Sequence, residues 1–572
     1  MHRGNVSITY KYLYIFGYGL TIPTSIIWLG TNYVNATTPA IIHTQNTPET
    51  LPEGEPSLTP QPETPETPQP EQKVLVNQVE VTGYQVFQPA EINAITQAFI
   101  GKSLTVSELA DIADKITELY LKQGYITSRA VLVDQTFTNG IVQIRVFEGG
   151  VDQILVEGTN KVKPEYIRSR IRLAGLNPLR KDKLEEQLIL LRTDPLFKNV
   201  EGSIRSAGAG SKFGQSILTI RVIEADAFQS NVSIDNYSPP TVGSERMNLG
   251  LGYRNLITSG DQISANYSRS TTGGANIYDF SYRVPVNAKN GTIQLRTLFS
   301  NYQITDPGFK SLNIRGDSNL YEITYRQPLV RSPKSEFALS WGFSHQNGQT
   351  FLFDNLPFPF GIGPDSDGVS RTSVFHFGQD YIKRDTKGAW ALRSQFNLGT
   401  GLFNATINNH PTPDSRFFSW TGQAQRVQQL SDDQLLIAML DIQLTPHSLL
   451  PSQQFVIGGV QSLRGYRQNL RSGDNGVRLS LEDRITIHRN AAGATTLQII
   501  PFIDVGTVWN HPDNPNKVPR QKFLSSLGLG LLWEPLPKLN LRLDYGIPLI
   551  NVRDRGENLQ DTSLYFSVSY QP

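Results

Sequence analysis

Two short segments, "QSLRGYRQNL" (461–470) and "PFIDVGTVW" (501–509), combine charged residues with glycines in a way that suggests a specific contact. Period-two alternation in the second segment places Asp504 on the polar face of a predicted strand. A carboxylate there needs a cationic partner, and a guanidinium offers the strongest, bidentate pairing. Arg464 is the candidate partner. Gly506 has no side chain and leaves room beside Asp504 for an incoming loop.

The rest of the chain shows no catalytic or metal-binding pattern. It has 0 Cys, which excludes disulfides, thiol nucleophiles and cysteine zinc sites. The 8 His are scattered, and the glycine-rich "GAGSKFG" (208–214) lies between two predicted strands, as in a hairpin rather than a phosphate loop. No G-x-S-x-G nucleophile elbow occurs. We therefore expect a protein that is not an enzyme and binds no cofactor or metal. The formal net charge of +1 argues against a nucleic-acid partner.

The N-terminal segment has the pattern of an export signal. Residues 12–30 carry no charge, Arg3 and Lys11 precede them, and the small residue Ala36 follows. This predicts a signal peptide over residues 1–36, with an uncleaved membrane anchor as the alternative. Either segment takes the chain out of the cytoplasm.

Residues 37–73 are rich in Pro and Thr and nearly devoid of large apolar side chains. Such a segment cannot bury a core, so we expect an extended periplasmic linker. A Pro-rich ligand for a binding module is the alternative.

Two small α+β units are predicted next, over residues 74–149 and 150–226. Each shows the order strand, helix, helix, strand, strand, and the second helix of the first unit opens with a capping box from Thr105 to Glu108. Neither unit contains a catalytic constellation. Their open strand edges are suited to binding an extended peptide by β-augmentation.

Residues 227–572 show recurring segments of alternating polarity separated by turn residues, which is typical of a transmembrane β-barrel. A soluble sandwich also alternates. However, Arg, Asp and Glu on the polar faces, and Trp or Tyr at the ends of the apolar faces, favour a wet interior and a lipid-facing exterior. The sixteen segments begin near residues 228, 246, 262, 277, 292, 320, 337, 372, 390, 417, 434, 477, 497, 523, 539 and 563.

The longest predicted connection, residues 445–476, contains the motif with Arg464. If this loop folds back into the barrel, Arg464 reaches Asp504, and Arg478 and Glu482 on the neighbouring segment can join the network. The sequence suggests no partner for Arg467 or Arg471.

Together, "SLRGYR", "FIDVG", the two N-terminal units and the sixteen segments resemble the TpsB transporters of two-partner secretion, which share a superfamily with BamA-type assembly factors. The N-terminal units look like POTRA domains. The resemblance implies two motifs. The loop tip motif comprises Leu463, Arg464, Gly465 and Tyr466, and the barrel-wall motif comprises Phe502, Asp504 and Gly506.

The resemblance also implies a function. Such a barrel sits in the outer membrane, surrounded by its lipid, with the POTRA domains in the periplasm. These domains capture an unfolded, TpsA-like partner protein, and the pore conducts it to the surface without ATP. A BamA-type insertase is the alternative within transport, and a diffusion porin or an outer-membrane enzyme is a more distant one.

Insertion of the barrel itself by the barrel-assembly machinery is also implied. We expect Phe566 and Tyr570 to serve as its C-terminal signal, although Tyr570 lies two positions before the final residue. Leu463 stands where Val is more usual. The Pro-rich tract occupies the place of the plug helix that some members carry, so no plug is predicted.

Overall fold

The computed structural model describes residues 43–44, 73–208, 213–353, 355–553 and 556–572. The predicted signal peptide and nearly all of the predicted linker lie outside these residues. None of the helices in the described part is long and apolar enough to cross a membrane. The chain divides into two compact units, with the boundary between Ala225 and Asp226.

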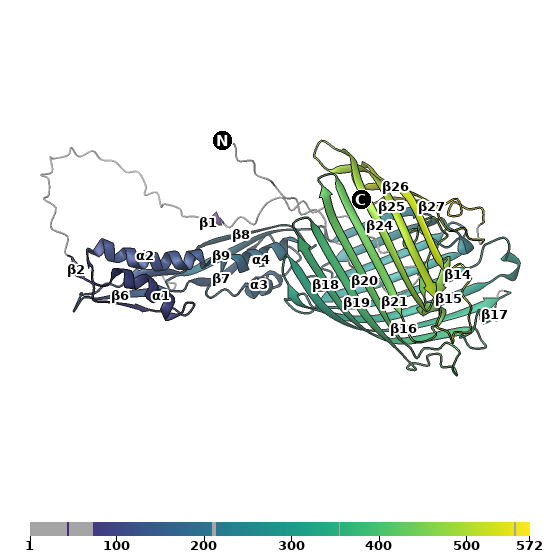
Figure 1. The fold of residues 1–572 in the computed structure, drawn as a ribbon, viewed down its shortest axis with the longest axis horizontal. Helices are drawn as coiled ribbons and strands as arrows, with labels where there is room; N and C mark the ends of the chain where they lie inside the picture. The colour runs from purple at the N-terminus through teal and green to yellow at the C-terminus, as the bar shows by residue number, and fades with distance from the viewer. Residues whose placement is uncertain (1–42, 45–72, 209–212, 354, 554–555) are drawn as a thin grey trace. The chain divides into compact units, whose positions relative to one another are not determined.

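The N-terminal unit contains two repeats with the same topology (Figure 1). In each, the long strand before the helices (β3 or β7) lies parallel to the last strand (β6 or β9). The last strand also pairs antiparallel with the strand that precedes it (β5 or β8), so the sheet orders are β3-β6-β5 and β7-β9-β8. The first repeat comprises β2 (Val74–Leu75), β3 (Gln78–Thr82), α1 (Pro89–Thr96), η1 (Gln97–Phe99), β4 (Ser103–Leu104), α2 (Val106–Lys122), β5 (Arg129–Leu132) and β6 (Ile141–Phe147). The second comprises β7 (Gly150–Glu157), α3 (Pro164–Ile171), η2 (Arg172–Ala174), α4 (Lys181–Arg192), β8 (Phe197–Ser206) and β9 (Gln215–Glu224).

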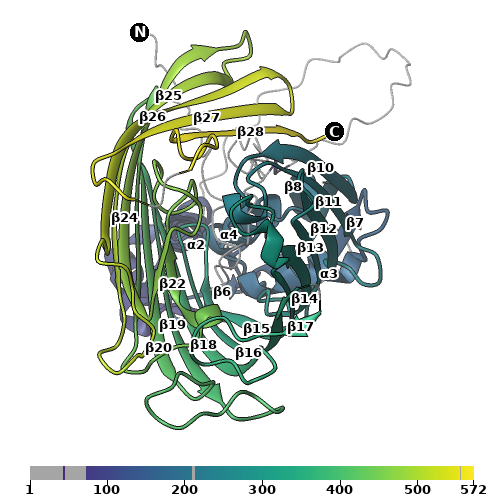
Figure 2. The ribbon, with the colours of Figure 1, turned by 90° about the vertical axis from the view of Figure 1, so that its right-hand side faces the viewer.

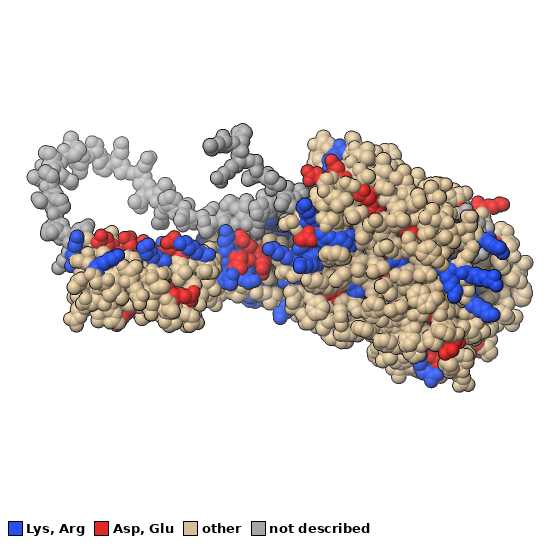
Figure 3. All heavy atoms as spheres, viewed as in Figure 1, with Lys and Arg blue, Asp and Glu red and all other residues tan. Residues whose placement is uncertain are grey.

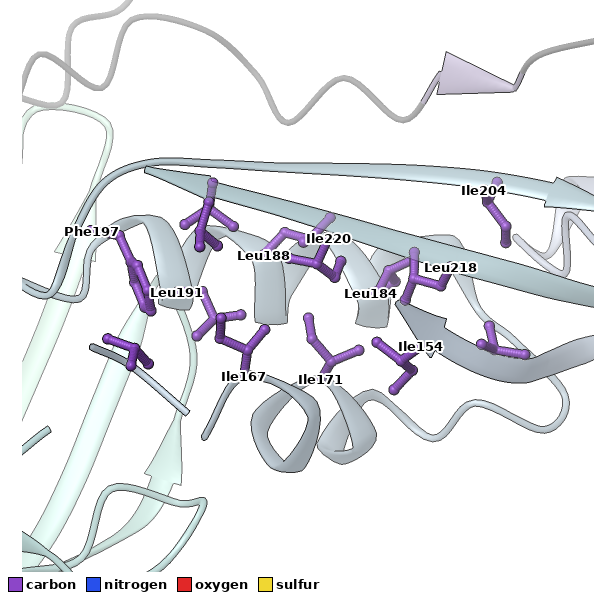
Figure 4. Packing of buried hydrophobic residues seen from close by; sticks show 14 of the residues in the cluster. Ile154, Ile167, Ile171, Leu184, Leu188, Leu191, Phe197, Ile204, Leu218 and Ile220 are labelled. Carbon is purple, nitrogen blue, oxygen red and sulfur yellow. The ribbon is translucent and has the colours of Figure 1, made fainter. Parts of the chain in front are cut away.

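Each repeat packs its two helices on one face of its sheet. The predicted capping box starts α2, because the Thr105 N–H donates to Glu108 Oε2 (2.7 Å) and the Glu108 N–H donates to Thr105 Oγ1 (3.3 Å). Apolar residues spaced for one helix face then fill the core. In the second repeat the labelled side chains meet between α3, α4 and the sheet (Figure 4).

In each repeat a glutamate at the end of the last strand binds backbone N–H groups of the segment that leads from the sheet to the first helix. Glu148 accepts the N–H groups of Gln85 (2.6 Å) and Val86 (2.8 Å), which follow the first strand. Glu224 accepts the Val162 N–H (2.9 Å) at the equivalent place. The repeats therefore share a local device as well as a topology.

Part of one open sheet edge is occupied by the chain itself. β1 (His43–Thr44) pairs in parallel with Ser203 and Ile204 of β8. The edge strand β5 of the first repeat pairs only with β6 among the described strands.

The C-terminal unit is a closed antiparallel barrel, and the sixteen predicted strands are confirmed (Figures 1 and 2). A short strand, β17 (Leu356–Pro357), adds to the end of β16. The barrel closes where β10 meets β28, with Val232–Asp235 opposite Ser567–Tyr570. The strands are β10 (Phe228–Asp235), β11 (Arg246–Arg254), β12 (Gln262–Ser270), β13 (Ala275–Pro285), β14 (Thr292–Gln303), β15 (Arg315–Arg331), β16 (Ser335–Leu352), β18 (Val369–Asp385), β19 (Gly388–Thr400), β20 (Phe418–Ser431), β21 (Gln434–Leu444), β24 (Asn475–Arg489), β25 (Thr495–Trp509), β26 (Phe523–Leu536), β27 (Leu539–Pro548) and β28 (Leu564–Tyr570).

The barrel strands turn apolar side chains outward and polar or small ones inward. Along β26, Leu527, Leu529 and Leu531 are exposed, whereas Ser526 is buried. On the barrel face shown in Figure 3, charged residues lie mainly toward the two ends. This is the polarity expected of a lipid-facing surface around a wet lumen.

The connections differ in length between the two ends of the barrel. At one end they are short turns: 255–261, 286–291, 332–334, 386–387, 432–433, 490–494 and 537–538. At the other end are the longer loops, among them 353–368, 401–417, 445–474, 510–522 and 549–563. Loops 236–245 and 304–314 at this end carry η3 (Pro240–Val242) and η4 (Lys310–Leu312).

Candidate functional site: the lumenal loop and its wall

Loop 445–474, called the lumenal loop here, connects β21 to β24 and has structure of its own. It contains η5 (Pro451–Gln453) and the hairpin of β22 (Phe455–Ile457) with β23 (Arg471–Gly473). Seen from the end, β22 lies within the outline of the barrel (Figure 2). The predicted return of this loop into the lumen is therefore observed.

A tight turn shapes the loop before its tip. The Gly459 N–H donates to the Leu463 carbonyl (3.1 Å) and the Leu463 N–H to the Gly459 carbonyl (2.9 Å). Gly459 has φ +94°, and a Cβ there would lie 1.9 Å from Gln468 Oε1. Only glycine suits this position, since the backbone is left-handed and there is no space for a side chain.

Arg464 is the centre of the tip contact. Its Nε donates to Asp504 Oδ2 (2.7 Å) and its Nη2 to Asp504 Oδ1 (2.8 Å), which is the bidentate geometry predicted from the sequence. Its own backbone N–H also donates to Asp504 Oδ2 (3.0 Å). Nη1 donates to Glu482 (2.9 Å), and the guanidinium lies 3.4 Å from the centre of the Phe502 ring. Arg464 is 3% exposed, so this contact is dry.

The wall balances this buried charge with ion pairs of its own. Arg542 donates to Asp544 (2.6 Å) and to Glu482 (3.1 Å), and Arg484 donates to Glu482 (2.7 Å). With Arg464 and Asp504 the cluster holds three guanidinium groups and three carboxylates. Buried ions are tolerated when they are paired in this way, whereas removal of one partner is costly.

Glycines allow the backbone of the tip to touch the wall. Gly465 has φ +91°, and a Cβ built on Gly546 of β27 would lie 2.6 Å from the Gly465 nitrogen. A Cβ on Gly506 would lie 3.0 Å from Leu463 Cδ1. A side chain at Gly546 is excluded because it would meet backbone atoms of the loop, and the space beside Gly506 is tight because the Leu463 side chain occupies it.

Tyr466 fixes the far side of the tip and is 2% exposed. Its hydroxyl donates to the Ser525 carbonyl (2.7 Å) and accepts from the Ile550 N–H (3.2 Å). The hydroxyl of Tyr565 donates to the Tyr466 carbonyl. All four residues of the tip motif, Leu463 to Tyr466, therefore contact the wall.

Three sequence predictions about cations need correction. Arg467, for which no partner was expected, pairs with Asp561 (Nη2 to Oδ2, 2.8 Å). Arg471, also without an expected partner, donates to the Gln521 carbonyl (3.1 Å). Arg478 does not join the Arg464 cluster but pairs with Asp441 (2.7 Å) and donates to the Gln461 carbonyl. These partners lie on β21 and in distant loops, which alternation within one strand cannot reveal.

Sequence reasoning also missed residues of the wall. Arg542 and Asp544 stand on the polar face of β27 together with Gly546, the same pattern that singled out Asp504 and Gly506 on β25. This pattern of charged residues and a glycine on the polar face of a strand could have identified β27 as part of the wall site. Asp561 stands in loop 549–563, where no periodicity marks it.

The outer end of the loop is held by a different carboxylate, Asp474, which is fully buried. It accepts the N–H groups of Leu449 (3.0 Å) and His511 (2.8 Å) and the side-chain amides of Gln454 (3.1 Å) and Asn514 (2.9 Å). It forms no ion pair with any residue in the described ranges. Neutral donors thus fasten the base of the lumenal loop to loop 510–522.

The two residues predicted as an insertion signal lie on β28. Tyr570 is 47% exposed beside the outward-facing Val568, and Phe566 is half-buried. Their use as a signal stays a prediction.

Residues 214–532 match the family of the haemolysin secretion/activation proteins ShlB/FhaC/HecB, and residues 74–149 match the ShlB-type POTRA domain. The chain belongs to the ShlB/FhaC/HecB family. This is a family of outer-membrane transporters rather than enzymes, with POTRA domains in the periplasm. Outer-membrane barrels have short periplasmic turns and longer extracellular loops, which assigns the short turns of this barrel to the periplasmic side.

The relatives have low sequence identity to this chain, but the aligned regions cover most of each protein. The outer membrane transporter CdiB of Escherichia coli is 24% identical over 77% of this chain and 74% of its own length. The heme/hemopexin transporter protein HuxB of Haemophilus influenzae is 22% identical over 82% of both chains. Hemolysin transporter protein ShlB of Serratia marcescens is 22% identical over 76% of both.

Solved structures show the same fold. CdiB from Escherichia coli aligns over 90% of this chain and 93% of its own, with a TM-score of 0.66 and 20% identity. BamA from Haemophilus ducreyi lacking POTRA domains 1-3 aligns over 87% of this chain and all of its own, with a TM-score of 0.52 and 16% identity.

Proposed function

We propose that this barrel carries one unfolded partner protein from the periplasm to the cell surface, and that the lumenal loop closes the pore until the partner arrives. The observation that carries the proposal is the clamp of Arg464 on Asp504 and Glu482 inside a barrel of a secretion family. The ShlB-type POTRA match over residues 74–149 favours a secretion pore over a plain diffusion pore.

The loop crosses the lumen between two parts of the wall. Near its start, Leu449 packs with Val374 of β18, and Gln453 donates to Thr372 of the same strand (3.2 Å). Its tip binds β24, β25 and β27 through Arg464. In the order of strands around the barrel, β18 and β27 lie seven places apart, close to opposite positions. A polypeptide passing outward must therefore displace the loop.

The POTRA repeats are proposed to supply the partner in an extended form. The edge strand β5 is available for β-augmentation among the described strands, and part of the edge of β8 is covered by β1. Backbone pairing at such an edge recognises an unfolded chain with little dependence on its sequence. The energy for passage comes from binding and from folding outside, so we propose that no ATP is used.

A secretome comparison tests this function. The gene is deleted in its host, and proteins in the medium and in the outer membrane are quantified by mass spectrometry. Loss of one or a few large proteins from the medium, with other outer-membrane barrels unchanged, is the expected result. A broad loss of barrels from the outer membrane would overturn the proposal in favour of an insertase.

Complementation of the same deletion strain distinguishes the contribution of the loop to export from that of the POTRA units. Complementation with Arg464→Ala tests the clamp, and complementation with a chain lacking residues 74–226 tests capture. In both, the amount of inserted barrel is measured first. Wild-type export by an inserted barrel without the POTRA units would contradict capture, whatever the loop variant does.

A further inference from the structure

The outer face of the barrel carries a continuous row of aromatic side chains across β15 to β20. Neighbouring ring centres are 6.2 Å apart for Tyr325 and Trp341, and 5.8 Å apart for Trp341 and Phe377. The row continues through Phe396 (6.5 Å from Phe377) to Phe418 (6.1 Å from Phe396). Trp341, Phe396 and Phe418 are exposed on the apolar face of their strands. This part of the lipid-facing surface is thus lined by flat rings.

Loop 401–417 extends this surface beyond the ends of the strands. Phe403 is 67% exposed, and its ring centre lies 5.6 Å from that of Phe343 and 6.0 Å from that of His345. Phe343 in turn contacts Phe375, which is exposed on the outer face (4.9 Å). The loop therefore lies along the outer wall of the barrel, with its most exposed ring in line with the lipid-facing rings.

The exposure of Phe403 results from a fixed backbone. The Ser373 hydroxyl donates to the Leu402 carbonyl (2.8 Å), and the Thr406 N–H donates to the Arg371 carbonyl (2.9 Å). Phe403 has φ +54°, a left-handed conformation that is unusual for a bulky residue and persists where the surroundings enforce it. The loop is therefore held with this ring against the outer wall and largely exposed.

Arg371 lies on the same outer face, nearer than Phe375 to the loop end of β18. By alternation Arg371 shares the face of Phe375 on β18, and the strand register places it opposite Asn347, next to the pair of Ser373 and His345. Its guanidinium forms no ion pair with another residue in the described ranges. Apolar rings with a basic residue just outside them form the pattern of a membrane interface, where the cation meets lipid headgroups.

We propose that loop 401–417 is a lipid-binding element of the outer leaflet. Phe403 and Leu402 insert at the boundary between headgroups and acyl chains, and Arg371 binds a lipid phosphate. Continuity with the lipid-facing wall favours lipid over a protein partner for this surface. The inference depends on the membrane location of the barrel and is independent of the proposed export function.

Site-specific quenching tests the proposal. The chain has 0 Cys, so Phe403→Cys carries a single fluorescent label on the full chain. The protein is reconstituted into phosphatidylcholine vesicles with or without bromine on the acyl chains. We expect brominated lipid to quench this label several-fold more than a label at Phe360→Cys, an exposed phenylalanine of loop 353–368. If Phe403→Cys does not insert, Leu402→Cys takes its place. Strong quenching by aqueous iodide, with none by brominated lipid, would overturn the proposal.

A second arm tests the phosphate. Thermal unfolding of the reconstituted barrel is followed with and without phosphatidylglycerol in the vesicles. We expect the anionic lipid to stabilise the wild type more than Arg371→Gln, whereas Arg416→Gln, in the same loop but paired with Asp414, responds like the wild type. An equal response of the wild type and Arg371→Gln would contradict the assignment of Arg371. Protection of the Phe403 label only by an added protein would show that the surface binds a protein instead.

Discussion

Two buried aspartates hold the two ends of the lumenal loop, and they do so with different chemistry. Asp504 at the tip is 1% exposed and binds the guanidinium of Arg464, with further donation from the Ser480 hydroxyl (2.6 Å). Asp474 at the base is fully buried and binds only neutral N–H donors among the described residues.

The difference indicates which end is able to move. When the tip leaves, Glu482 keeps Arg484 and Arg542 as partners, and Arg464 becomes solvated in the wet lumen. Of the three wall carboxylates only Asp504 then loses its cation, and it keeps the hydrogen bond from the Ser480 hydroxyl. Asp474 has no cation to replace the donors it would lose, so separating it from them leaves a bare charge in a dry site. We therefore propose that the base is the anchor and that the tip is the part that is released.

The largest effect is expected from Arg464→Ala. The change leaves Asp504 without its cation in a site built to exclude water, a loss on the order of 3–5 kcal/mol for a buried pair. We expect the loop tip to leave the wall and the pore to conduct ions in planar bilayers. Arg464→Lys keeps the charge but loses the bidentate contact, so its pore conductance should lie between those of the wild type and Arg464→Ala. A closed pore in Arg464→Ala would contradict the clamp.

The next largest effect is expected at the base of the loop, where Asp474→Asn is compared with Asp504→Asn at the tip. Asp474→Asn replaces a carboxylate by an amide of the same shape, whose NH₂ group faces donors and loses their hydrogen bonds, about 1–3 kcal/mol in total. We expect faster hydrogen exchange in residues 445–454 and a lower unfolding temperature, with the tip still in place. Asp504→Asn should instead speed exchange at residues 461–468. Identical exchange patterns in the two variants would show that the ends are not distinct.

A steric change probes the tip without altering any charge. Gly546→Ala places a methyl group 2.6 Å from the Gly465 nitrogen, a backbone atom that cannot turn aside. We expect a measurable rise in open-pore current, smaller than that of Arg464→Ala. Gly252→Ala on β11 is the matched control, because the nearest atom to its methyl group is 3.8 Å away. Equal currents in both variants would remove the close contact from the mechanism.

The smallest effect concerns a carboxylate in solvent. The hydrogen bond from the Thr105 backbone N–H lowers the pKa of Glu108 below its ordinary value of 4.5. A lowered pKa in the folded state stabilises α2 above that value, and the stabilisation is lost as the pH falls through the folded-state pKa. We expect the protection factors of amides 105–109 of the full chain, taken relative to the intrinsic exchange rate at each pH, to fall modestly below about pH 4.5, and Glu108→Gln to abolish this pH dependence. A loss as large as that in Asp474→Asn would contradict the distinction between exposed and buried carboxylates.

The sequence predicted most of the fold because barrel strands repeat a simple pattern. Each of the sixteen predicted segments falls on a strand, since alternation is imposed residue by residue by lipid on one side and water on the other. In the N-terminal unit the capping box marked the start of α2 for an equally local reason. The pairing of β1 with β8 carried no such local signal.

The site was predictable only in part, for a related reason. Asp504 was found because a charge and a glycine break the apolar character of one strand, and Arg464 because it was the available cation in the longest loop. Asp561 and Asp474 stand in loops, where no period exists, and their partners come from chain segments far away in sequence. Long-range contacts between loops depend on how the barrel closes, which local pattern does not encode.

A reversible lock on the loop tip tests whether the tip must leave the wall during export. Leu463 Cδ1 lies 3.0 Å from the position of a Cβ on Gly506, so Leu463→Cys with Gly506→Cys brings two thiols together in a chain that has 0 Cys of its own. Release of the tip predicts that the oxidised variant is inserted but exports no partner, and that a reductant restores export. Wild-type export by the oxidised protein, with the disulfide verified by its gel mobility, would show that the loop does not have to leave the wall.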